Sequence, residues 1–262
     1  MYSKDDIINS IINIGVKRTD TLLVHSSMKS VGIVENGADT VLDAFMEYMK
    51  DGLLIFPTHT WAQMNDEYNI FNPETEPSCV GILSNIFRKR PNVIRSLHPT
   101  HSVAAYGSYA IEYASGEEKW DTPCPRDGCW GKLYDRRAKI LFLGCSLRCN
   151  TLLHGVEEWN SIPIRLASTC QQLKIVTPEG QIINRPLHRH YNPLCDVSEH
   201  YGKMLEPFMC LGIAKKGYIG DAGSILCDAV GMADLTTLFL KRNPDLFIDN
   251  NPVPTEWYIK KY

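Results

Sequence analysis

Three side chains near the middle of the chain have types and spacing that could support proton transfer: Thr151, His154 and Glu157. Residues three apart on a helix lie on one face. A carboxylate can hold one imidazole nitrogen as N–H, which leaves the other nitrogen free to accept a proton. We therefore expect an apolar strand over 139–144, a loop, and a helix that Asn150 or Thr151 caps and that presents His154 as a base. The alternative is a capped helix with an ordinary surface His and Glu.

Histidine and hydroxyl-bearing residues follow two other apolar runs. Thr21–Val24 leads into His25-Ser26-Ser27, and Leu53–Phe56 leads into Pro57-Thr58-His59-Thr60. In open α/β sheets, ligands bind where the strands end. Hydroxyl and loop N–H groups at such a place suit phosphate- or amide-rich ligands. The alternative is turn and cap chemistry, for which Ser and Thr are also chosen.

The elements that must position these residues alternate between strands and helices. The apolar spacing predicts helices starting at Ser3 and over 41–49, 82–87, 110–114, 198–209 and 233–241, a strand over 103–107, and a hairpin of 173–176 with 181–183. This alternation predicts an α/β fold: a three-layer-like α/β sandwich with a mixed central sheet and an additional small β/α portion in the C-terminal half. We expect one domain over residues 1–262.

Two stretches show no clear periodicity, and two groups of histidines raise the question of a metal. Residues 62–78 and 120–131 are expected to be irregular, the first as a long acidic loop. The pair His98 and His101 flanks Pro99, which a regular helix interior excludes. The second group is His188, His190, Cys195 and His200, and its spacing matches no familiar zinc pattern. We therefore expect no metal.

Composition excludes several classes of function. The chain has 262 residues, 44% of them hydrophobic, and a net charge of −3, so no strongly basic face for nucleic acid is implied. No signal peptide and no run of membrane-spanning length is evident. The nine cysteines are an odd number without a regular framework, which favours reduced thiols. We expect a cytoplasmic protein that is a monomer or a homodimer.

Seven segments, in order, carry a resemblance to a known family. They are Val24–Ser27 with Gly32; Phe56–Thr60; Phe71–Glu74 with Gly81 and Arg88; Arg95–Pro99 with Ser102, Ala105 and Gly107; Leu143–Gly144; Thr151–His154 with Glu157; and Ile219–Ala222. Together they resemble the aminoglycoside 3-N-acetyltransferase family, the antibiotic N-acetyltransferases distinct from the small GNAT fold. The resemblance runs from about Ile7 to Leu246.

The resemblance implies transfer of an acetyl group from acetyl-CoA to a primary amine, usually the 3-amino group of a 2-deoxystreptamine ring, as in antibiotic resistance. The family's catalytic histidine falls on His154, and its supporting acid falls on Glu157. The groove for acetyl-CoA would comprise His25, Ser26, Ser27, Pro57, Thr58, Thr60, His98 and Ser102.

The chemistry fits these assignments. An ammonium cannot attack a thioester, so a base with a pKa near neutrality must remove a proton, and His154 is the obvious type, with His98 as the second candidate. Thr151 or Thr60 could donate to the oxyanion of the tetrahedral intermediate. The carboxylates of Asp66, Glu67 and Glu158 would hold a polycationic sugar, with solvated loop charge as the alternative.

Three other functions compete with this interpretation. The first is a metal-dependent hydrolase that uses His98, His101, His188 or His190. The second is a CoA-binding protein without antibiotic turnover, or a family member that acts on a different amine. A serine hydrolase is disfavoured because the sequence lacks a GxSxG elbow.

Overall fold

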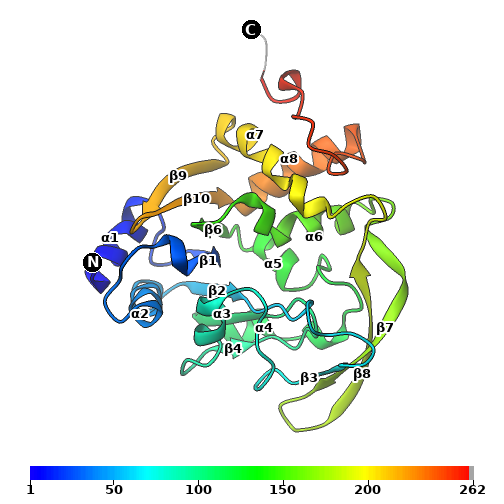
Figure 1. Cartoon of the computed structure of the whole chain (residues 1–262), viewed down its shortest axis with the longest axis horizontal. Coiled ribbons are helices and arrows are strands. Elements are labelled where there is room, and N and C mark those ends of the chain that lie inside the picture. Colours follow the sequence, from blue (N-terminus) through cyan, green and yellow to red (C-terminus); the bar gives the residue numbers. More distant parts are fainter. Residues whose placement is uncertain (260–262) are drawn as a thin grey trace.

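The computed structural model describes residues 1–259 (Figure 1). The helices are α1 (Lys4–Asn13), α2 (Ala38–Tyr48), α3 (Ile82–Phe87), α4 (Ala110–Ala114), α5 (Cys129–Asp135), α6 (Thr151–Trp159), α7 (Leu205–Cys210) and α8 (Ala229–Arg242). The strands are β1 (Thr21–Ser26), β2 (Leu53–Pro57), β3 (Ile70–Phe71), β4 (Ile94–Arg95), β5 (Val103–Gly107), β6 (Lys139–Leu143), β7 (Leu166–Val176), β8 (Ile182–His190), β9 (Ala214–Ile219) and β10 (Ala222–Asp228). Short 3₁₀ segments include Leu147–Cys149 and Val197–Met204.

Seven strands form a mixed central sheet in the order β4-β5-β2-β1-β6-β10-β9. Its middle is parallel, because β1 pairs in parallel with both β2 and β6, and the outer strands run antiparallel. The three parallel strands are the apolar runs that the sequence predicts, and parallel strands covered by helices are buried on both faces. Their carboxyl ends therefore meet at one edge of the sheet.

Alternating side chains of these strands enter two separate cores. Leu22, Val24, Leu54 and Phe56 pack with residues of α1, α2 and α3. Leu23, Ile55, Ile140 and Phe142 pack with α5, α6 and α8 on the opposite face. This is the period of two that an extended strand imposes. The two cores confirm the predicted three-layer α/β fold with a mixed sheet.

A second sheet of three strands, in the order β3-β7-β8, stands apart from the large one. In Figure 1, β7 and β8 form the long arm at the right. The sequence predicts only the tip of this hairpin, and it predicts a loop where β3 pairs in parallel with β7. The loop prediction for 62–78 is thus wrong at Ile70–Phe71. The antiparallel pair β9 and β10 is not predicted at all.

Local signals at helix ends give mixed results. The helix predicted to start at Ser3 is confirmed, and Ser3 forms a capping box with Asp6 at the start of α1. The capping prediction for α6 is wrong: its N-cap residue Asn150 makes no side-chain cap bond, and the hydroxyl of Thr151 turns to His59 instead. The stretch 120–131 is irregular only as far as Cys129, where α5 begins. Within residues 1–259, no helix has the length and apolar character needed to cross a membrane.

Candidate active site

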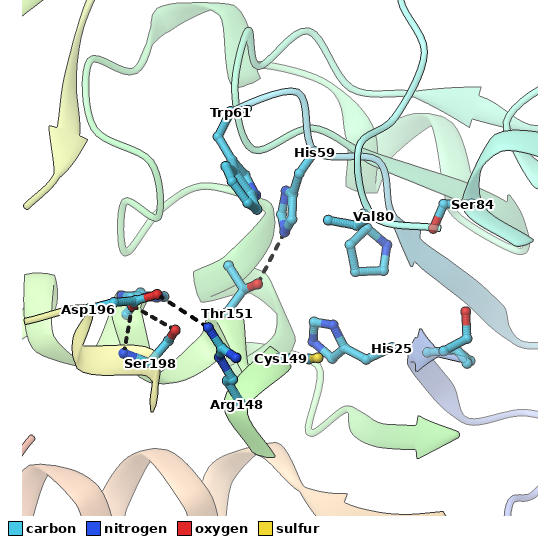
Figure 2. Close-up of a pocket in the computed structure, with 14 residues that line it drawn as sticks. His25, His59, Trp61, Val80, Ser84, Arg148, Cys149, Thr151, Asp196 and Ser198 are labelled. Atoms are coloured by element: carbon cyan, nitrogen blue, oxygen red, sulfur yellow. Dashed lines mark hydrogen bonds and ion pairs between the residues drawn. The ribbon is translucent and has the colours of Figure 1, made fainter. Parts of the chain in front are cut away.

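A cavity of about 390 Å³ opens at the edge where β1, β2 and β6 end. Residues from β1, from the segment after β2 and from α6 line it, as Figure 2 shows. The lining residues are Val24, His25, Ser26, Pro57, His59, Trp61, Val80, Ser84, Arg148, Cys149, Thr151, His154, Asp196 and Ser198. The size is that of a small-molecule site, and the place is the one expected for a ligand of a parallel sheet.

A chain of hydrogen bonds leads inward from His154. Its Nδ1 lies 2.8 Å from the hydroxyl of Tyr201, which donates over 2.6 Å to Oε2 of Glu157. Arg165 donates from Nε to the other oxygen of Glu157. Glu157 and Arg165 are almost wholly buried, with side chains 1% and 4% exposed. The predicted pairing of His154 with Glu157 therefore exists, but it runs through a tyrosine rather than directly.

The imidazole of His154 faces the cavity while its surroundings keep it neutral. Its side chain is 18% exposed, and among the described residues no hydrogen-bond partner is found for Nε2. Burial, and then the neighbouring His190, lower the pKa of His154 well below its ordinary value of 6.5. His190 stacks on it with ring centroids 4.4 Å apart. The expected pKa near neutrality is therefore not found. A neutral ring with one free nitrogen is still the form that accepts a proton.

Thr151 adds a hydroxyl to the same wall. Its Oγ1 lies 3.1 Å from Nε2 of His59 (Figure 2). The other proposed donor, Thr60, is fully buried and gives its hydroxyl proton to the carbonyl of Pro99 over 2.6 Å. Of the two hydroxyls, only Thr151 can reach a molecule in the cavity.

The residues after β2 alternate between the cavity and the interior. Pro57, His59 and Trp61 line the cavity, whereas Thr58 and Thr60 point inward, which is the alternation of extended chain. Oγ1 of Thr58 lies 2.9 Å from Oγ of Ser102, and Arg95 donates to both hydroxyls.

The end of β1 contributes two of its three predicted residues to the lining. His25 and Ser26 border the cavity, and Ser27 is only partly buried but stands outside the lining set. Burial lowers the pKa of His25 to about 3, so its ring offers no positive charge to a phosphate near neutral pH.

Comparison with known proteins decides the family. The family model described as aminoglycoside 3-N-acetyltransferase matches residues 23–241. The chain belongs to this family of acyltransferases.

Relatives within this family agree in sequence and in fold. Aminoglycoside N(3)-acetyltransferase IX of Micromonospora chalcea is 25% identical over 253 residues, covering 87% of this chain and 89% of that protein. Aminoglycoside N(3)-acetyltransferase IV of a Salmonella species is 30% identical over 176 residues, which span 66% of this chain and 65% of that protein. The crystal structure of aminoglycoside acetyltransferase AAC(3)-IVa superposes with a TM-score of 0.81 at 26% identity, covering 94% of this chain and 91% of that one.

Besides Thr58 and Thr60, two more residues that the resemblance to this acetyltransferase family assigns to the acetyl-CoA groove lie inside the protein. His98 is fully buried; its Nε2 bonds the carbonyl of Thr122 and its Nδ1 accepts from the N–H groups of Thr100 and His101. Ser102 is fully buried in the cluster with Thr58 and Arg95. Thr58, Thr60, His98 and Ser102 therefore support the groove from behind instead of lining it. Both nitrogens of His98 are occupied, so it is also unsuited to act as a base.

The three carboxylates proposed for the aminoglycoside stand outside the cavity lining among the described residues. Asp66 and Glu67 are exposed, and Asp66 accepts from the backbone N–H of Gln172 in β7. Glu158 is turned inward, where it bonds His190 and accepts from the N–H of Cys124. Burial raises the pKa of Glu158 to about 8 and lowers that of His190 to about 3. The raised pKa of Glu158 and the lowered pKa of His190 indicate that the carboxyl is protonated and donates to a neutral imidazole.

The histidines considered for a metal come together only in part. The rings of His98 and His101 have centroids 6.0 Å apart and those of His101 and His190 5.2 Å apart, but within the described chain these three do not form a set of metal ligands. Nδ1 of His188 bonds the carbonyl of Ala167, and Cys195 contacts carbonyls near the C-terminus. Within the described chain, the one group whose ligand atoms lie within 4.8 Å of one another is Cys124, Glu158 and His190. Glu158 already bonds His190 and the backbone N–H of Cys124. Burial raises the pKa of the Cys124 thiol well above its ordinary value, which disfavours the thiolate that metals bind. The absence of a metal stays a prediction.

Several residues of this family member's site carry no local signal in the sequence. Tyr201 and Arg165 lie 47 and 11 positions after His154, and only the fold brings them to Glu157. Trp61, Arg148 and Asp196 line the cavity from loops and a 3₁₀ segment. His59 falls within a predicted turn, and the period of two after β2 is the signal that would have separated it from its neighbours.

Proposed function

We propose that this chain transfers the acetyl group of acetyl-CoA directly to a primary amine, with the 3-amino group of a 2-deoxystreptamine aminoglycoside as the acceptor and His154 as the general base. One observation carries the assignment of the base: the free Nε2 of a neutral His154 faces the cavity while Nδ1 is held from behind. Family membership supports the reaction class. A histidine-to-alanine variant of AAC(3)-IVa, 25% identical to this chain, is solved in complexes with a gentamicin and with apramycin.

The proposed reaction needs two things from the protein, a base and a donor to the oxyanion. His154 removes a proton from the acceptor ammonium, so that the amine nitrogen can attack the thioester carbonyl. The hydroxyl of Thr151 donates to the oxygen that becomes negative in the tetrahedral intermediate. The C–S bond then breaks and CoA leaves as the thiolate. The nitrogen loses its remaining extra proton and the thiolate takes one up, so the products are the amide and CoA. No side chain is acylated, so no nucleophilic Ser or Cys is required.

We place the reacting end of acetyl-CoA against His25 and Ser26 on one side and Pro57 and His59 on the other, since these residues line the cavity at the ends of β1 and β2. The thioester then lies between this part of the wall and His154 of α6. The buried cluster of Arg95, Thr58 and Ser102 fixes the backbone of the segment after β2. The acceptor approaches from the side of Trp61, Asp196 and Ser198.

Calorimetry tests this placement. We expect acetyl-CoA to bind with an affinity that treatment with a chelator leaves unchanged, because no metal takes part. Ser26→Trp should weaken binding by tenfold or more, about 1.4 kcal/mol, by filling the cavity. Ser115→Trp, at an exposed position after α4, is the control. Folded protein without affinity for CoA or acetyl-CoA would reject the proposal. Stoichiometric zinc in the purified protein, with loss of binding when a chelator removes it, would reject it as well.

A thiol-release assay with an aminoglycoside panel tests the acceptor. We expect turnover of aminoglycosides that carry a free 3-amino group, and NMR of the product should place the acetyl group on that nitrogen. Acetylation only at another position, such as a 6′-amine, would overturn the regiochemistry and leave the fold and the base untouched.

A second candidate is acetylation of an amine with fewer positive charges. Among the described residues that line the cavity, Asp196 is the one carboxylate, and Arg148 lies 4.0 Å from it (Figure 2). A polycationic sugar would therefore meet a wall of nearly balanced charge. A monoamine carries a single positive charge and would not need further carboxylates. The same assay with monoamines separates the two. CoA binding without acetylation of any amine would instead indicate a binding protein.

A further inference from the structure

Glu157 stands too far from His154 to orient it directly. Its Oε2 lies 4.0 Å from Nδ1 of His154, beyond hydrogen-bond range. The hydroxyl of Tyr201 fills this gap and contacts both groups. We infer that Tyr201 is a positioning residue of the reaction, and that Glu157 acts on His154 only through it. The inference rests on the proposed role of His154 as the base.

The number of available protons fixes the direction of the chain. Burial raises the pKa of Glu157, and the hydroxyl of Tyr201 and the guanidinium of Arg165 oppose this shift. Arg165 donates to Oε1, and a charge-assisted bond of this kind favours the ionised carboxylate. Tyr201 has a single hydroxyl proton, and the carboxylate takes it on Oε2. The phenol oxygen can then only accept from His154, so the proton of the neutral imidazole sits on Nδ1 and Nε2 keeps its lone pair. The reverse direction, from a protonated Glu157 through Tyr201 to Nδ1, would put the imidazole proton on Nε2 and remove the base.

Packing holds the phenol in this place. Tyr201 is fully buried, and its ring meets the rings of His154 and Phe247 edge-on, with centroids 5.0 and 4.8 Å away. Burial raises the pKa of Tyr201 well above 10, so the phenol keeps its proton as a donor. A side chain fixed by close packing can hold its partner within the small tolerance that catalysis requires.

Tyr201→Phe tests the inference, because it removes the hydroxyl and keeps the ring. We expect kcat to fall about 10- to 100-fold, as for the loss of a coupled group beside a general base, with KM unchanged. Glu157→Gln should cause a similar loss. The double variant should be no slower than the slower single variant, since both changes break one chain. Tyr113→Phe is the control: that tyrosine is also buried, but its hydroxyl donates to the carbonyl of Cys129 in the core, and kcat should not change.

Two outcomes would overturn the inference. The first is a double variant whose loss equals the product of the single losses, because Glu157 would then act independently of Tyr201. The second comes from NMR with ¹⁵N-labelled histidine, in which His154→Ala identifies the signals of His154. We expect a proton on Nδ1 in the wild type and a mixture of tautomers in Tyr201→Phe; an unchanged tautomer would reject the role. The NMR result does not depend on turnover, so failure to find any acceptor would count against the proposed function alone.

Discussion

His154→Ala should lower kcat by about 10²- to 10⁴-fold, the usual contribution of a positioned general base. Affinity for CoA should change little, because the imidazole faces the reacting amine. Burial lowers the pKa of His154 well below 6.5, so the wild-type base stays neutral at pH 7, and kcat should decline only at pH values well below 6.5. The residual rate of the variant should instead rise with pH as the acceptor amine itself loses its proton.

A matched histidine variant separates this effect from a general disturbance. His200→Ala changes a partly buried histidine in the segment Val197–Met204, outside the cavity lining, and should leave kcat intact. Wild-type turnover by folded His154→Ala saturated with both substrates would exclude His154 as the base. His59, which lines the cavity beside Thr151, would then be the candidate to test, because both nitrogens of His98 are already bonded.

Acid should unfold the protein at unusually mild pH. Burial lowers the pKa of His25 to about 3, of His98 to about 4 and of His190 to about 3. The unfolded chain, with histidine pKa values near 6.5, binds protons that the folded chain refuses. Stability contributed by the neutral rings is therefore complete above pH 6.5 and is lost as the pH falls toward 4. Each such histidine contributes a slope of up to about 1.4 kcal/mol per pH unit in this window.

Three histidines together give up to roughly 4 kcal/mol per pH unit. Glu158 offsets about 1.4 kcal/mol of this slope, because its pKa of about 8 in the folded chain lets it hold a proton that the unfolded chain releases. The remaining slope of roughly 2.8 kcal/mol per pH unit is still a large share of the 5–15 kcal/mol that stabilises a typical domain. Urea unfolding at pH 7.5, 6.5, 5.5 and 5.0 measures the slope. His98→Gln should be less stable than the wild type at pH 7.5, yet lose about 1.4 kcal/mol less per pH unit below pH 6. A stability that stays flat from pH 7.5 to 5.0 would show that these rings are protonated without cost in the folded state.

The strands of the central sheet were predictable because burial on both faces makes each a continuous apolar run. β1, β2, β5 and β6 coincide with such runs within two residues at either end. The pair β9 and β10 was missed because Lys215, Lys216 and Gly217 interrupt the apolar pattern at an exposed edge of the sheet. Most of β7 and β8 was missed for a similar reason: polar side chains interrupt the apolar pattern in a hairpin whose faces are only partly buried.

The site residues also fall into those that the sequence pattern predicts and those that only the fold brings together. His154, Thr151, His25 and Ser26 were found because polar residues at the start of a helix or the end of a buried strand must emerge at the cavity edge. The hydrogen bond between Tyr201 and Glu157 could not be predicted, since nothing near His154 in the sequence points to Tyr201. Glu158 was assigned to the polycationic sugar because it follows Glu157 on the active helix, whereas the fold turns it toward His190.

Arg189 of β8 connects the long hairpin arm to the loop beside the cavity. It donates to the carbonyls of Trp61 and Met64, and thereby ties the small sheet to the segment that runs past the cavity. That wall is preorganised: the conformational entropy of the segment is lost when the chain folds, so an acceptor need not order it on arrival. Association would then be limited by diffusion and orientation of the acceptor, as expected for a rigid site. Differences in affinity between acceptors should consequently appear mainly in their dissociation rates.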